Sequence, residues 1–290
     1  MLISKSLNTR SFSGVQWKFI ITAILLFLPL QELTANVLVS PTVVFITDKN
    51  PTGRITLLNR GNTPQEVSVY FSFGLPVSDS LGNISVAFQD SAVTDPRSCL
   101  EWVRAFPKRV IINPDESQIV RLMMRPPDNL PDGEYWARIM VRSQNATVEV
   151  PVAGEQDGIK TQLNMITEMA IMLKYRTGDL ISDVELHNVS AVLKDSSVEV
   201  MIDLENRGNV SYMGMLETRL LDSDNKEISS NLRKLAVYRH LKRRIDLEFV
   251  GGEFKPPYRI EIKIGSEGRN DVTPEDMIIG NKITHTVVIK

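Results

Sequence analysis

The chain has 290 residues, of which 42% are apolar and 23% are charged, and its formal net charge is −2. These are ordinary values for a globular protein, and they supply enough apolar material for the cores of one or two domains. A mildly acidic chain has no bulk attraction for nucleic acid, which argues against that class of partner.

The first 35 residues are predicted to be a secretory signal peptide. Lys5, Arg10 and Lys18 form a basic leader, and an uncharged apolar run follows over 19–30. That run is shorter than the roughly 20 residues of a membrane-spanning helix. The alternative is an uncleaved anchor. Cys99 is the one cysteine, so an internal disulfide is excluded and we expect Cys99 to be a buried apolar side chain.

Short β-strands are predicted from residue 37 onwards. Alternation is clearest over 66–73, where Val67, Val69 and Phe71 occupy every second position. A period of two with one apolar face is typical of a half-buried strand. Further strands are predicted at 37–39, 41–46, 54–58, 84–88, 108–112, 118–123, 134–141 and 161–175. The segment 74–98 is predicted to be a loop apart from the short strand at 84–88.

A second block of strands begins after Gly178-Asp179. Its strands are predicted at 184–186, 197–204, 214–221, 235–238, 243–249, 258–264 and 282–289. No long amphipathic helix is predicted. The pattern therefore favours an all-β fold, with two immunoglobulin-like β-sandwich domains in tandem over 36–176 and 177–290 and a hinge at 175–179.

An internal repeat supports two copies of one fold. The run Leu57–Asn62 recurs as Leu204–Asn209, and both copies share the letters Asn-Arg-Gly-Asn after a strand. We expect the glycine of each copy to adopt a positive φ. Tyr135 and Tyr258 each stand at the entrance of a late strand, as in a tyrosine corner.

Several motifs resemble the PapD-like periplasmic chaperones that assemble pili and fimbriae. The first-domain motifs are Ser98–Trp102, Pro107, Ile112–Leu122 and Leu130–Tyr135, and the second-domain motifs are Asn206–Gly214 and Leu235–Tyr238. The resemblance covers roughly 37–265. It implies a periplasmic protein that binds pilus-like subunits and an outer-membrane usher, without a cofactor or a small-molecule substrate. It also implies donor-strand complementation, in which the chaperone lends an edge strand to a subunit that lacks one.

The strand implied for lending is the last of the first domain, at 161–175. One of its faces is predicted to bind the subunit through Leu163, Met165, Thr167, Met169 and Ile171. Methionine is unbranched and polarizable, so it adapts to varied pockets. The same stripe is also what a final strand packing against its own core would show, and the opposite face carries Asn164, Ile166, Glu168 and Ala170.

The resemblance fails at the basic residues that grip a subunit's terminal carboxylate in familiar chaperones. Thr42 and Met172 stand where those cations are expected, which leaves Arg54, Lys174 and Arg176 as candidate anchors. No catalytic motif is found, and the three histidines are far apart in sequence, so neither an enzyme nor a metal site is predicted. The alternative function is a structural or adhesive cell-surface protein built from immunoglobulin-like modules.

Overall fold

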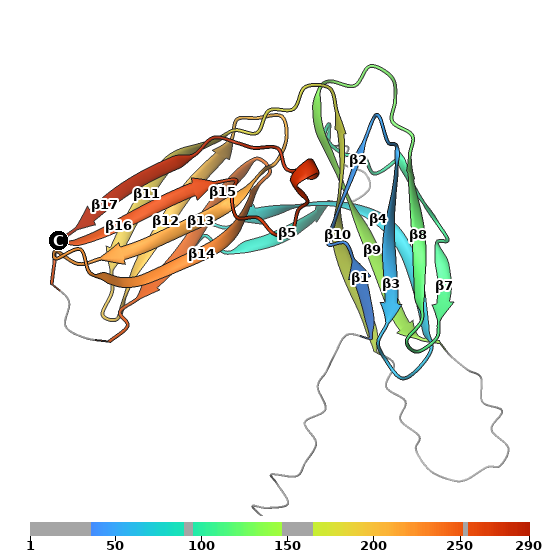
Figure 1. Ribbon diagram of the computed structural model, residues 1–290, viewed down its shortest axis with the longest axis horizontal. Helices are drawn as coiled ribbons and strands as arrows, with labels where there is room; N and C mark the ends of the chain where they lie inside the picture. The colour runs from blue at the N-terminus through green and yellow to red at the C-terminus, as the bar shows by residue number, and fades with distance from the viewer. Residues whose placement is uncertain (1–35, 90–94, 147–164, 252–254) are drawn as a thin grey trace, which may run out of the picture. The chain divides into compact units, whose positions relative to one another are not determined.

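The computed structural model describes residues 36–89, 95–146, 165–251 and 255–290, and Figure 1 shows their arrangement. The predicted signal peptide at 1–35 lies outside this part of the chain. The described elements are strands, apart from one 3-10 turn, η1 (Pro274–Asp276). None of the described helical segments is long and apolar enough to cross a membrane.

Ten strands form a first pair of sheets. One sheet has the order β1-β3-β8-β6, and the other has the order β2-β10-β9-β4-β5, with β7 also paired to β4. Their bounds are β1 Val37–Ser40, β2 Val43–Thr47, β3 Thr52–Asn59, β4 Gln65–Ser78, β5 Ile84–Gln89, β6 Val103–Phe106, β7 Arg109–Ile112, β8 Ser117–Met124, β9 Gly133–Asn145 and β10 Ile166–Thr177. Both sheets contribute alternate side chains to one core, with Leu57 and Val120 from the first and Val69 and Ile139 from the second.

Seven strands form a second pair of sheets, with the orders β11-β12-β15 and β14-β13-β16-β17. Their bounds are β11 Val184–Leu193, β12 Ser197–Asn206, β13 Tyr212–Leu221, β14 Glu227–Val237, β15 His240–Glu248, β16 Tyr258–Gly265 and β17 Ile283–Ile289. Val200 and Ile202 of one sheet share a core with Leu216 and Ile260 of the other. The all-β fold of two tandem sandwiches is therefore confirmed. Residues 36–290 form one compact unit, and the domain boundary at 176/177 stays a prediction.

The prediction of a loop at 74–83 is wrong in part. Strand β4 continues to Ser78 and pairs with β5, so that Gly74 lies opposite Phe88 and Pro76 opposite Val86. Glycine and proline ordinarily argue against a strand interior. They are tolerated here because β9 pairs with β4 only as far as Ser72, which leaves this part of β4 with β5 as its single described partner.

The repeated Asn-Arg-Gly-Asn runs have the same hydrogen bonds. Asn59 accepts from the amide of Gly61 at 2.9 Å and donates to the carbonyl of Thr63 at 2.9 Å. Asn206 accepts from the amide of Gly208 at 2.9 Å and donates to the carbonyl of Val210 at 2.8 Å. The expected positive φ is wrong, because neither glycine is among the left-handed residues. The asparagine side chain closes each turn instead.

Two further expectations are confirmed. The hydroxyl of Tyr135 donates to the carbonyl of Pro131 at 2.8 Å, which is the hydrogen bond of a tyrosine corner, whereas a corner at Tyr258 stays a prediction. Cys99 is buried in the first core.

Candidate functional site

Strand β10 has two halves with different neighbours. Along its whole length, from Ile166 to Thr177, it pairs antiparallel with β9. Strand β2 pairs with its other side in parallel, but only over Met172–Arg176. Within the described part of the chain, the second side of Ile166–Ile171 therefore faces no strand. An edge of this kind presents unpaired backbone N–H and C=O groups to another chain.

The free edge follows from the path of the first strands. Strand β1 pairs with β3 in one sheet as far as Ser40, and the chain then crosses at Pro41 to join β10 at Val43 in the other sheet. The crossing places β2 beside the second half of β10 only (Figure 1). Proline suits this crossing because it cannot donate a ladder hydrogen bond.

The predicted lending residues differ in exposure. Met165 is 54% exposed, Thr167 is half-buried, Met169 is partly buried against the first core and Ile171 is buried within it. Leu163 lies outside the described residues. The face that carries Thr167, Met169 and Ile171 thus turns towards the core of its own sandwich, and that core becomes more open towards the start of the strand.

We call Ile166–Ile171, whose second side faces no described strand, the free half of β10. The face of this free half that is opposite to Thr167, Met169 and Ile171 carries both apolar and charged side chains. Ile166 is 47% exposed, and Glu168 and Ala170 are also exposed. Tyr70 of β4 donates a short hydrogen bond from its hydroxyl to Glu168. The most exposed apolar side chains of β10 and its approach are therefore Met165 and Ile166, one on each face.

The second half of β10 is held by a buried ionic cluster. Glu134 of β9 lies between two cations of β10: its carboxylate is 3.2 Å from the Nζ of Lys174 and 2.8 Å from the Nε of Arg176. The indole of Trp136 and the hydroxyl of Ser211 donate to Glu134 at 2.7 and 2.6 Å. The side chains of Lys174 and Glu134 are 1% and 0% exposed.

The cluster stays ionised at neutral pH because its charges compensate one another. Burial acts to raise the pKa of Glu134, but the charges of Lys174 and Arg176 outweigh it and lower that pKa to about 2. Burial also lowers the pKa of Lys174 to about 8, although Glu134 opposes this shift. The Lys174 ammonium further lies 4.9 Å from the centre of the Tyr238 ring, where a cation–π contact offsets part of the lost hydration.

Two of the candidate carboxylate anchors, Lys174 and Arg176, belong to this cluster. Both side chains are buried and pair with Glu134, and their role as anchors stays a prediction. Met172 is buried beside Trp136 and Tyr238, whereas Thr42 is exposed and uncharged. Of the three candidate anchors, Arg54 alone has an exposed charge, and it lies on β3, in the sheet opposite β10.

Sequence reasoning missed the role of Glu134. In the sequence, Glu134 was noted only as one residue of the motif Leu130–Tyr135. The available signal was a pair of cations, Lys174 and Arg176, on alternate positions of a strand that is otherwise apolar there. Buried cations need an anion. Among the described residues, no three His, Cys, Asp or Glu side chains are grouped so as to hold a metal ion.

Neither a family model nor a curated protein matches the chain. Similar solved structures include the YadV chaperone, which is 15% identical over 88% of this chain and 100% of that one, with a TM-score of 0.42. The class 5 fimbriae chaperone CfaA is 17% identical over 88% and 99%, with a TM-score of 0.41. The Salmonella enterica complex of SafA pilin with the SafB chaperone gives 14% over 88% and 97%, with a TM-score of 0.41.

Proposed function

We propose that this chain is a periplasmic assembly chaperone that completes the unfinished sheet of a pilus-type subunit by lending it the free half of β10. The observation that carries the proposal is the single-sided pairing of Ile166–Ile171. The sequence motifs of the PapD-like chaperones in both halves of the chain support the same function. Binding of this kind needs no catalytic group and no cofactor.

The free half offers backbone pairing as the source of affinity. Each backbone hydrogen bond formed with a partner strand contributes about 0.5–1.5 kcal/mol net. The six residues from Ile166 to Ile171 have a free backbone edge on the side away from β9. Along that edge, the backbone N–H and C=O groups of every second residue point towards a partner strand. Apolar side chains then fix the register.

Met165 is the side chain best placed to enter a partner's groove. It precedes β10, is exposed, and lies on the same face as Met169 and Ile171. A subunit that lacks a strand exposes the interior of its own sandwich, and Met165 would extend this chain's core into that interior. Met169 and Ile171 instead support the strand from beneath.

The test is Met165→Asp, with Leu232→Asp on β14 as the matched control because Leu232 is also an exposed apolar residue. Each variant is produced in the periplasm together with a pilus-type subunit that is insoluble alone. The wild type and the Leu232 control are expected to yield a soluble 1:1 complex on size exclusion, and the Met165 variant none.

Hydrogen exchange gives a second readout that does not depend on the side chain. The amides of Ile166–Ile171 that face the open edge are expected to gain protection when the subunit binds. If the Met165 variant still retains the subunit and these amides exchange as fast in the complex as in the free chain, β10 is not the strand that is lent. Retention of the chain on washed cells, with no such complex, would favour the adhesive alternative.

A further inference from the structure

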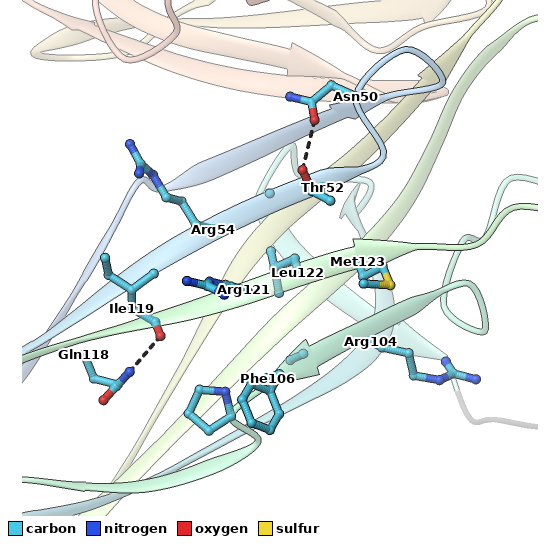
Figure 2. A pocket seen from close by; sticks show the side chains of 13 residues that line it. Asn50, Thr52, Arg54, Arg104, Phe106, Gln118, Ile119, Arg121, Leu122 and Met123 are labelled. Atoms are coloured by element: carbon cyan, nitrogen blue, oxygen red, sulfur yellow. Dashed lines mark hydrogen bonds between the residues drawn. The ribbon is translucent and has the colours of Figure 1, made fainter.

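The outer face of the β1-β3-β8-β6 sheet carries a groove with a volume of about 1010 Å³. It is lined by side chains of β3, β8 and β6 and by the loop before β3 (Figure 2). We call the six charged and apolar side chains that dominate it the arginine face. They are Arg54, Arg104, Phe106, Ile119, Arg121 and Met123.

Strand register brings these side chains into rows across the sheet. Arg54 of β3 lies directly opposite Arg121 of β8, and Arg121 lies opposite Phe106 of β6. In the next row, Met123 lies opposite Arg104. Adjacent strands are about 4.8 Å apart, so side chains in one row are near neighbours. Cationic and apolar side chains of β3, β8 and β6 thus lie next to one another along the pocket, as the sticks in Figure 2 show.

The charges of this face lack anionic partners. Within the described residues, no carboxylate oxygen lies within 4.0 Å of the guanidinium of Arg54, Arg104 or Arg121. Arg104 donates to two backbone carbonyls nearby, at 2.8 Å each. By contrast, Arg207 and Arg219 on the second sandwich each have two carboxylate partners.

Two acidic residues that line a neighbouring pocket together with Arg54 already have hydrogen-bond or ion-pair partners. Asp271 and Asp276 line that smaller pocket together with Arg54. Asp271 is bound by Arg269 at 2.7 Å, and Asp276 accepts from the hydroxyl of Thr273 at 2.7 Å. The chain therefore does not neutralise the arginine face from within its described residues.

This arrangement opposes folding. Like charges directly opposite one another on a sheet are destabilising, and Arg54 and Arg121 are such a pair. Phe106, at 77% exposed, also has a large ring left in water. Unpaired cations next to exposed aromatic and aliphatic groups are the composition of a binding surface, since arginine and aromatic side chains supply much of the affinity at protein interfaces.

We propose that the arginine face binds an acidic segment of another polypeptide, in which carboxylate and apolar side chains alternate. Guanidinium groups pair with carboxylates in a bidentate geometry, which suits Arg54 and Arg121 side by side. Phe106, Ile119 and Met123 give the apolar side chains of the same segment a surface to cover. The chain as a whole has a net charge of −2, so it has no bulk attraction to an anionic membrane.

This inference does not depend on the proposed function of β10. The arginine face and β10 belong to opposite sheets of the first sandwich. A partner on the arginine face therefore leaves the free edge of β10 open, and the two surfaces can be occupied at the same time.

The experiment measures binding of a fluorescein-labelled peptide in which glutamate alternates with leucine and phenylalanine. The second probe is the same peptide with glutamine in place of glutamate, and the third is a vesicle of phosphatidylglycerol. The test variant is Arg54→Gln with Arg121→Gln. The matched control is Arg60→Gln with Arg142→Gln, which removes the same charge from exposed positions elsewhere on the first sandwich.

The wild type is expected to bind the glutamate peptide, with an affinity that falls as salt is added. The Arg54/Arg121 variant is expected to bind it at least about tenfold more weakly, whereas the control changes by less than about twofold. The glutamine peptide is expected not to bind. The thermal midpoint of the Arg54/Arg121 variant is expected to rise, because the repulsion is removed, and this separates a binding role from a structural one.

Three results would overturn the proposal. The first is no binding of the glutamate peptide by the wild type. The second is an equal loss of affinity in the control variant, which would show attraction by overall charge. The third is binding of phosphatidylglycerol vesicles through Arg54 and Arg121 without binding of the peptide, which would assign the face to a lipid surface.

Discussion

Replacing Glu134 by glutamine tests the buried ionic cluster most directly. The change keeps the size of the side chain and its capacity to accept from Trp136 and Ser211, but it removes the negative charge between Lys174 and Arg176. Removing one partner of a buried pair costs about 3–5 kcal/mol, because the remaining charge is left uncompensated. A protein of this kind has about 5–15 kcal/mol of stability in total.

For Glu134→Gln we expect a loss of stability at the lower end of the range of about 3–5 kcal/mol. The pKa of Lys174 is already lowered to about 8, and Glu134 is the group that holds it up. Without Glu134, Lys174 can lose its proton at neutral pH and so avoid part of the penalty, whereas Arg176 cannot. We therefore expect Glu134→Gln to lower the free energy of unfolding by about 3 kcal/mol at pH 7.

Urea unfolding followed by tryptophan fluorescence measures this loss, since Trp136 lies in the cluster. Adding Lys174→Met to Glu134→Gln is expected to recover part of the loss, because the uncompensated ammonium is then gone. Glu168→Gln is the matched control, an exposed carboxylate on the same strand pair, and is expected to change stability by less than about 0.5 kcal/mol. If Glu134→Gln unfolds at the wild-type urea midpoint, the cluster does not stabilise β10 as argued.

Three further outcomes follow from local geometry. The pKa of Glu134 is about 2 in the folded chain and about 4.3 in the unfolded chain, so the unfolded state binds more protons between these two pH values. The stability that Glu134 contributes is therefore complete above this pH window and is lost as the pH falls through it. Urea midpoints measured at each pH are expected to fall less steeply for Glu134→Gln than for the wild type. Gly208→Ala is expected to lower the free energy of unfolding by roughly 2 kcal/mol or more, because the added Cβ would lie 2.1 Å from the backbone oxygen of Ile181. Gly265→Ala is the control, since its Cβ would lie 3.7 Å from the nearest atom, and it is expected to melt close to the wild-type temperature. Tyr135→Phe is expected to cost about 1 kcal/mol in urea unfolding through loss of the hydrogen bond to Pro131.

Strands with clear alternation could be predicted from the sequence because burial alone determines them. Val67 and Val69 point into a core and the residue between them does not, so the alternation over 66–73 identifies a strand even when the strands beside it are unknown. Strand β6 was not predicted, since its four residues are too few to establish a period. The extension of β4 past Gly74 was missed because edge pairing with β5 outweighs the local preferences of glycine and proline.

The candidate site could be predicted only as far as its strand. The stripe at 161–175 indicated an amphipathic strand, but which half of it lies open depends on where β2 joins, and that is set by a crossing at Pro41, far away in sequence. Likewise, Lys174 and Arg176 looked like free cations because Glu134, their partner, lies on another strand. Pairing between distant segments is a tertiary property that local pattern does not encode.

The two halves of β10 depend on one another. A strand that lends its edge must stay extended although it has a neighbour on one side only, and a rigid edge loses less conformational entropy when a partner pairs with it. Strand β2 and the Glu134 cluster hold the second half and so keep the first half in register on β9. We therefore expect Glu134→Gln to weaken capture of a subunit, although Glu134 is buried and lies beside the second half of β10, not the half proposed to bind the subunit. In the free variant, the amides of Ile166–Ile171 that pair with β9 are expected to exchange faster than in the wild type. Unchanged exchange there, together with weaker capture, would mean that the cluster acts on the partner by another route than the order of β10.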